Sequence, residues 1–308
     1  MSEGALPSPS AVTSPALTYR KGVFLVLFAG VLWSSMGLGI RYMEVANVWQ
    51  ILFYRSLALA VFLFLVITFR SAGRPLPTIR KAGLAGIVGG LGLIFAFAGG
   101  IFAIQTTSVA NAMFLFATAP FMAAILGWFI LREGVRKATW IAMAFAVIGI
   151  SIMVWDGISL GYIIGNLAAM ASALGFAVFT IALRWRKLDD MMPTVFLGGI
   201  FAIIASAIIC YTDGYSLGLP LNDITIALSL GVFQVGAGLT IYTIGSKVVP
   251  AAELALLSMT EVVLGPFWVW MVLGESAGFY TLLGGAILLS AIAGNALSGL
   301  RRKPVPIL

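Results

Sequence analysis

Almost the whole chain beyond residue 19 consists of long apolar runs separated by short polar loops. Each run has about 20 residues, the length that an α-helix needs to cross a bilayer. The runs are continuous, which argues against the short alternating strands of an outer-membrane barrel. The pattern predicts ten membrane-spanning helices, at 22–43, 48–69, 81–104, 108–131, 138–155, 160–184, 193–212, 223–246, 250–273 and 278–299.

The composition supports this class of protein. Hydrophobic residues make up 61% of the 308 positions and charged residues 9%, which is typical of a helical protein that spans the membrane many times. There is no histidine and a single cysteine, Cys210, so the chain has no intrachain disulfide and little with which to bind zinc or haem. We therefore expect no metal, no cofactor and no catalytic residue, and a protein that is not an enzyme.

The basic residues lie in loops on one side of the predicted bundle. If the chain begins in the cytoplasm, sixteen of the eighteen Lys and Arg residues fall on the cytoplasmic side, and only Arg41 and Arg55 do not. This is the positive-inside pattern of membrane proteins, and it explains the net charge of +7 without a nucleic-acid partner. It predicts a multi-pass protein of the inner (cytoplasmic) membrane with both termini in the cytoplasm.

An internal repeat divides the membrane region into two halves. Residues 110–152 align with 252–294 without a gap, and nine of the 43 positions are identical, against about four or five expected from composition. Each segment covers the fourth and fifth spans of a five-span half, and because five is odd the second half is inverted. The predicted domains are a disordered tail at 1–19, a five-helix half at 20–157, its inverted counterpart at 158–300 and a basic tail at 301–308.

Three features resemble the drug/metabolite transporter superfamily. They are the two five-span halves, the stretch 30–34 (GVLWS) in the first span, and a Leu-x-Glu that closes the fourth and ninth spans, at 131–133 and 273–275. The chain is similar to the ten-helix EamA-type branch, and within it to exporters of aromatic and neutral amino acids. The resemblance implies an all-α membrane fold, with ten transmembrane helices in two inverted five-helix repeats around a central cavity. The first-span glutamate with which small four-helix multidrug relatives exchange protons for cationic drugs is absent from the matching stretch, 32–35.

Two carboxylates interrupt the ninth apolar run, Glu253 near one end and Glu261 close to the middle. A charge at mid-membrane costs about 2.5–3.5 kcal/mol or more, so it persists where protein, water or a ligand meets it. Glu261 either binds a substrate ammonium or carries a proton in a cavity, or it is structural, hydrogen-bonded to a helix break or paired with Arg55. Arg55 in turn pairs with Glu44 or Glu261, binds a substrate carboxylate, or extends to the outer surface, and the last interpretation is favoured.

Polar and aromatic residues near the middle of other spans complete a candidate substrate-binding set. Asn111 and Gln234 stand out because each amide has four hydrogen-bonding positions to satisfy. Trp33 is unusual because membrane tryptophans prefer the interfaces. For the hydroxyls the alternative is helix–helix hydrogen bonding, and for the phenylalanines it is packing. The full set is Trp33, Ser34, Phe95, Asn111, Thr118, Phe176, Gln234, Tyr242, Ser258 and Glu261.

Two prolines lie inside predicted spans, Pro120 in the fourth and Pro266 in the ninth. Each removes a backbone hydrogen bond and permits a kink, so both are candidate gating hinges that let half-helices rock during alternating access. The fifth and tenth spans carry almost nothing polar, which predicts a peripheral position facing lipid.

These patterns predict a secondary transporter that exports neutral or aromatic amino acids and related small metabolites by alternating access. Its partners would be a small-molecule substrate and the lipid bilayer, and it would act as a monomer. The alternatives are an exporter of cationic drugs with the same fold, a carrier of phosphorylated metabolites, and a membrane channel. The carrier of phosphorylated metabolites ranks low because Arg55 is the one basic residue near the midplane, and a channel because there is no repeated filter segment.

Overall fold

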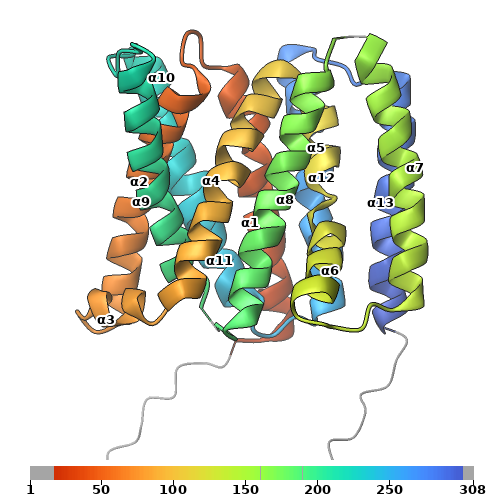
Figure 1. Cartoon of the computed structure of the whole chain (residues 1–308), viewed down its shortest axis with the longest axis horizontal. Coiled ribbons are helices and arrows are strands. Elements are labelled where there is room, and N and C mark those ends of the chain that lie inside the picture. Colours follow the sequence, from red (N-terminus) through yellow and green to blue (C-terminus); the bar gives the residue numbers. More distant parts are fainter. Residues whose placement is uncertain (1–16, 160, 189, 301–308) are drawn as a thin grey trace, which may run out of the picture.

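The computed structural model describes residues 17–159, 161–188 and 190–300, and every regular element in these ranges is a helix (Figure 1). Ten helical segments are long and apolar enough to cross a membrane, which confirms the predicted number. Residues 1–16 of the tail predicted at 1–19, and the whole tail predicted at 301–308, lie outside the described residues. The elements are α1 (Tyr19–Arg41), α2 (Val48–Arg70), α3 (Pro75–Arg80), α4 (Gly83–Thr106), α5 (Val109–Phe116), α6 (Ala119–Ile130), α7 (Lys137–Ser159), α8 (Ile163–Trp185), α9 (Met192–Thr212), α10 (Leu221–Ser229), η1 (Leu230–Ala237), α11 (Gly238–Gly245), α12 (Ala251–Leu273) and α13 (Phe279–Leu300).

The spans run antiparallel and side by side, so α1 begins and α13 ends at the same end of the bundle, the lower one in Figure 1. We call this the terminal end and the opposite one the far end. Short loops join successive spans, and the short helix α3 lies in the loop between α2 and α4, where Pro75 at its first position favours a helix start.

Close packing of small residues joins the spans in equivalent pairs. A Cβ built on Gly92 of α4 would lie 2.8 Å from the carbonyl oxygen of Gly175 in α8, and one built on Gly245 of α11 would lie 2.8 Å from that of Gly22 in α1. Small residues let helix backbones approach this closely. The third and sixth spans are thus paired in the first case, and the eighth and first in the second, as two inverted five-helix repeats require.

The fifth and tenth spans, α7 and α13, pack against each other at one edge of the bundle (Figure 1). Gly149 and Gly284 form their contact point, where a side chain on either would overlap the other's backbone. The outer surface of α7 is apolar, with Phe145 and Ile148 more than half exposed. This edge position agrees with the peripheral place predicted from the lack of polar residues.

Two spans are not continuous α-helices. The fourth is divided into α5 and α6, with the interruption at Ala117 and Thr118. The cause is Pro120, which has no N–H to donate and whose ring collides with the preceding turn, so it is accommodated at the second position of α6. The eighth span contains the π-helical segment η1 between α10 and α11. Pro266, by contrast, lies inside α12 without interrupting it.

Candidate functional site

The carboxylate of Glu261 is on the side of α12 that faces the bundle. The opposite side of this helix is apolar and about half exposed, at Val263, Phe267 and Trp270. Residues two positions apart are related by a rotation of about 200° around the helix axis, so their side chains face nearly opposite sides. Glu261 therefore points away from Val263 and towards α1. The backbone N of Glu261 lies 3.7 Å from a Cβ built on Gly30 of α1, so the two helices are in close contact at this depth.

Tyr242 lies near this carboxylate, and Trp33 packs against Tyr242. Their ring centroids are 5.1 Å apart, and the indole of Trp33 rests against Gly238 of α11, where a Cβ would stand 2.5 Å from Nε1. The hydroxyl of Tyr242 is within interaction range of Ser258 and near Glu261. Four of the predicted residues, from α1, α11 and α12, are therefore close to one another. We call Trp33, Tyr242, Ser258 and Glu261 the interior cluster.

The interior cluster offers a carboxylate, two hydroxyls and two aromatic rings. A carboxylate attracts a cation, and aromatic faces strengthen the attraction through their quadrupoles. All four side chains are partly buried, so electrostatic interactions there are stronger than in bulk water. The arrangement is suited to binding a small organic cation or the ammonium group of a larger solute.

Ser34 is used to join two helices. Its side chain is fully buried, its Oγ donates to the carbonyl of Val31 at 2.7 Å, and the same Oγ accepts the indole N–H of Trp268 in α12 at 2.9 Å. This is the helix–helix hydrogen bond that was the alternative for each hydroxyl. Trp268 is absent from the predicted set. The signal that points to it is the need of a partly buried indole N–H for an acceptor.

Asn111 belongs to a second polar group near the far end. Its Nδ2 donates to Thr107 Oγ1 at 3.2 Å and to the Oδ1 of Asn166 in α8, and Thr107 also donates to that Oδ1 at 3.1 Å. All three side chains are buried, and Asn111 Oδ1 and Asn166 Nδ2 have no partner. The group connects α5 to α8, and no feature of the sequence pattern indicated that Asn166 would take part.

Thr118 and Gln234 each lie where a helix departs from regular geometry. Thr118 precedes α6 at the interruption, and its Oγ1 donates to the carbonyl of Leu115 at 2.6 Å. The hydroxyl thus satisfies a backbone carbonyl at the interruption. Gln234 lies in η1, is 7% exposed, and its Oε1 has no partner. Within the part of the chain that the structure describes, no hydrogen bond joins either side chain to the interior cluster.

The two phenylalanines of the predicted set have different surroundings. Phe95 is 67% exposed and continues the outward stripe of α4 formed by Leu84, Val88 and Leu91, so it lies on the outer surface, away from the bundle interior. Its spacing of four from Leu91 is the reason, because residues three or four apart share a helix face. This placement does not fit the cavity wall predicted for Phe95.

Phe176 of α8 faces inwards. The outward stripe of α8 contains Leu167 and Leu174, and Phe176 is turned about 200° from Leu174. Its ring packs against Phe179, with centroids 5.5 Å apart, yet 48% of the side chain is exposed. An inward side chain that is half exposed borders open space within the bundle.

The structure contradicts the favoured interpretation of Arg55, in which the side chain extends to the surface. Arg55 is 2% exposed, and its guanidinium carbon lies 4.8 Å from the centroid of the Phe97 ring in α4. The ion pairs of the described residues include neither an Arg55–Glu44 nor an Arg55–Glu261 pair. Arg55 points inwards because it lies at the centre of the buried face of α2, in line with Leu52 and Leu59.

Ion pairs connect the two halves at both ends of the bundle. At the far end, Arg41 Nε lies 2.9 Å from Glu275 Oε2, Arg41 Nη2 donates to the carbonyl of Thr107, and Glu275 accepts the backbone N–H of Val109. At the terminal end, Arg184 pairs with Glu133. The two glutamates occupy equivalent positions of the repeat, after the fourth and ninth spans, and the arginines end the first and sixth.

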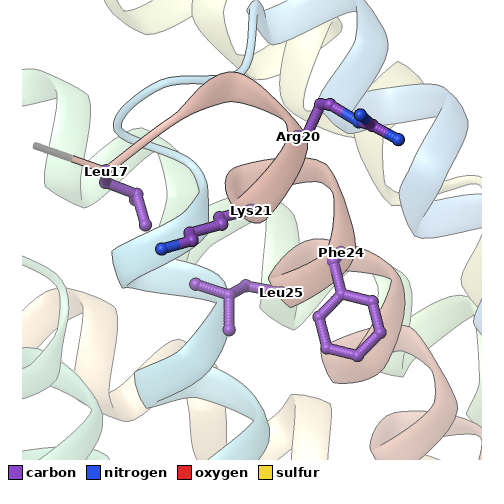
Figure 2. A pocket seen from close by; sticks show the side chains of 5 residues that line it. All are labelled: Leu17, Arg20, Lys21, Phe24 and Leu25. Atoms are coloured by element: carbon purple, nitrogen blue, oxygen red, sulfur yellow. The ribbon is translucent and has the colours of Figure 1, made fainter.

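Glu253 is engaged near the terminal end, where it accepts the hydroxyl of Tyr19 at 2.5 Å. The same end of α1 borders a groove of about 300 Å³ lined by five residues, shown in Figure 2. Lys21 and Leu17 lie on one side of the helix start, Arg20 extends to the other, and Phe24 and Leu25 form the apolar floor. Basic side chains above apolar ones are typical of a membrane–water boundary, and none of the predicted site residues lines this groove.

Both halves of the chain match one family model. Residues 20–155 match it once and residues 163–297 match it again, and the model is that of the EamA-like transporter family. The chain belongs to the EamA-like transporter family. This agrees with the ten spans and with the paired packing of the two halves described above, and it confirms the family to which the sequence motifs point.

Two curated relatives are themselves uncharacterized transporters. One, from Vibrio cholerae serotype O1, is 28% identical over 198 residues, or 61% of this chain, and the other, from Clostridium kluyveri, is 24% identical over 193 residues, or 59%. The matched region spans 62% of the length of each relative. A protein of known crystal structure superposes on 92% of this EamA-like chain and on all of its own, with a TM-score of 0.63 and 18% identity, which shows a shared fold.

Proposed function

We propose that this EamA-like protein is a secondary transporter that exports neutral or aromatic amino acids and related small metabolites. The observation that carries the proposal is the inward-facing Glu261 at the middle of α12, beside Trp33, Tyr242 and Ser258. A carboxylate is retained at mid-membrane when it has a functional partner. The ammonium of an amino acid is such a partner, and the two aromatic rings suit an apolar or aromatic side chain.

The mechanism we propose is alternating access. Inverted five-helix halves place the substrate site near the midplane, and rocking of one half against the other opens the two ends in turn. The equivalent pairs Arg41–Glu275 and Arg184–Glu133 connect the halves at opposite ends, so each would break when its own end opens. The interruption at Pro120 gives α5 and α6 freedom to move separately, whereas Pro266 lies in an unbroken helix.

The distribution of basic loops supports an inner-membrane location with both termini in the cytoplasm. In that orientation the terminal end faces the cytoplasm, where an exporter takes up its solute. We further propose that one chain is sufficient, because the interior cluster is complete within the chain.

Uptake into proteoliposomes tests this function. We expect the purified full chain to transport at least one of a panel of neutral and aromatic amino acids, and Glu261→Gln to lower the rate at least about tenfold, since a charge-assisted hydrogen bond contributes about 1.5–3 kcal/mol. Glu253→Gln is the matched control. It removes a carboxylate from the same helix, but one that contacts Tyr19 at the terminal end, and it should keep most of the activity.

An equal loss in both glutamate variants would remove Glu261 from the substrate site. Transport of cationic drugs, with no amino acid accepted, would favour the alternative of a multidrug exporter with the same fold.

A further inference from the structure

Arg55 is a buried charge with unsatisfied donors. Its side chain is 2% exposed, its Nε and Nη1 atoms have no hydrogen-bond partner, and no ion pair in the described part of the chain includes it. Arginine has five N–H donors and no acceptor, so each missing partner must be a group with lone pairs. An unpaired cation is expensive in a membrane protein, and residues of this kind mark substrate pathways.

Arg55 lies where two hydrophobic clusters of the bundle meet. On α2 it lies between Leu52, which belongs to one hydrophobic cluster of the bundle, and Leu59, which belongs to the other. Its guanidinium stands over the ring of Phe97, and Phe97 packs against both clusters. The aromatic face stabilises the positive charge without using any N–H donor, and the edge of the guanidinium plane stays available.

The neighbouring span adds a second unsatisfied group. Gly231 of η1 approaches the backbone of Arg55 so closely that a Cβ there would overlap the Arg55 carbonyl oxygen. Three residues further along η1, Gln234 has a buried Oε1 without a partner. Single π-helical segments within α-helices are frequent at functional sites. Unused donors on α2 and an unused acceptor on η1 thus occur at the same junction of the two halves.

We infer that Arg55 binds the carboxylate of the transported solute. The planar guanidinium presents a fork of N–H groups that matches a carboxylate with two parallel hydrogen bonds. One arginine supplies one positive charge, which balances a carboxylate and leaves a phosphate dianion uncompensated. The inference rests on the proposed function and completes it: Glu261 in the second half meets the ammonium, and Arg55 in the first half meets the carboxylate. A zwitterion therefore interacts with both halves.

Ligand binding to the detergent-solubilised full chain tests this assignment. A ligand that binds the folded state raises the unfolding temperature by mass action, so dissociation constants follow from a concentration series. The probes are L-phenylalanine and L-phenylalaninamide, which share the ring and the ammonium and differ in the carboxylate. For the unmodified protein we expect L-phenylalanine to bind about 10- to 100-fold more tightly, the range of one charge-assisted hydrogen-bonded pair.

In Arg55→Gln the preference should fall to about one, because L-phenylalanine loses affinity and its amide does not. Arg70→Gln is the matched control. It is the same change on the same helix, at an arginine paired with Asp190 at the terminal end, and it should keep the full preference. Arg55→Lys keeps the positive charge without the forked N–H groups and should give an intermediate preference for L-phenylalanine. It can be measured in place of Arg55→Gln if that variant does not fold.

A preference that is unchanged in Arg55→Gln, or in Arg55→Lys where only that variant folds, would overturn the role of Arg55 and leave the proposed function standing. If neither probe nor any amino acid of the panel binds the unmodified protein, the proposed function fails and this inference fails with it. Tighter binding of phenyl phosphate than of L-phenylalanine would overturn the carboxylate assignment.

Discussion

Asp223 and Glu261 are both carboxylates in apolar spans of the second half, but their partners differ. Asp223 is fully buried near the far end and accepts three backbone N–H groups, from Glu44, Val45 and Ala46, at 3.0–3.1 Å. These bonds hold the loop between α1 and α2 against α10. A carboxylate used in this way is structural, whereas Glu261 has no such set of backbone donors in the described contacts.

Replacing Asp223 should therefore cost stability. Asp223→Ala leaves three buried N–H groups without an acceptor, and each costs about 1–3 kcal/mol, so we expect the free energy of unfolding to fall by about 3 kcal/mol or more. The measurement is the midpoint of thermal unfolding in detergent. Asp213→Ala, at the exposed end of α9, is the control and should change the midpoint little. Equal shifts in the two variants would contradict this role for Asp223.

The sequence carries much of the information at the residue scale, but not the pairing of side chains. A carboxylate or an indole at mid-span is visible in the sequence, and in the structure Tyr242 is near Glu261 and Ser258 and packs against Trp33. The direction of Arg55 was not visible, because it depends on which face of α2 is covered by neighbouring helices. For the same reason the sequence did not separate Phe95, on the outer surface, from Phe176, which faces inwards.

Among the elements, the fourth and ninth spans are equivalent in the repeat but differ in the structure. The fourth is interrupted before Pro120, and the ninth is continuous through Pro266. The number of spans follows from hydrophobic runs of fixed length, so it was predicted correctly. The interruption in the fourth span and the π-helical segment in the eighth depend on local backbone hydrogen bonding, which a hydrophobic pattern does not record.

The two equivalent ion pairs give a prediction at this scale. The Arg41–Glu275 pair has further hydrogen bonds to Thr107 and Val109, so Glu275→Gln should weaken closure of the far end. The reporter is Met36→Cys on α1, whose side chain lies against Gly100 of α4 on the inner side of that pair. We expect its alkylation by a membrane-impermeant maleimide added to intact cells to become several times faster in Glu275→Gln.

Two features of the chain make this experiment specific. Its single cysteine, Cys210, is buried and can be replaced by serine, so the reporter is the one thiol present. Glu133→Gln is the matched control, because it removes the equivalent carboxylate from the terminal end and should not accelerate labelling. Acceleration by Glu133→Gln alone would mean that the terminal-end pair, not the far-end pair, limits access to position 36.

At the scale of the whole molecule, the two halves divide the charge of the proposed site between them. Glu261 belongs to the second half and Arg55 to the first, and the described ion pairs do not join them. A solute that carries both charges has a reason to interact with both halves, and movement of one half against the other then changes its surroundings. A carrier built in this way exchanges solute across the membrane and does not offer a continuous pore.

Counterflow measures that property directly. Proteoliposomes that contain the purified chain are loaded with unlabelled L-phenylalanine and diluted into a trace of labelled L-phenylalanine. The account predicts that the label accumulates inside above its external concentration and then declines, that the initial rate saturates with concentration, and that Glu261→Gln removes the overshoot. Label that only equilibrates, at a rate proportional to its concentration, would contradict a carrier, and an unchanged overshoot in Glu261→Gln would contradict its site.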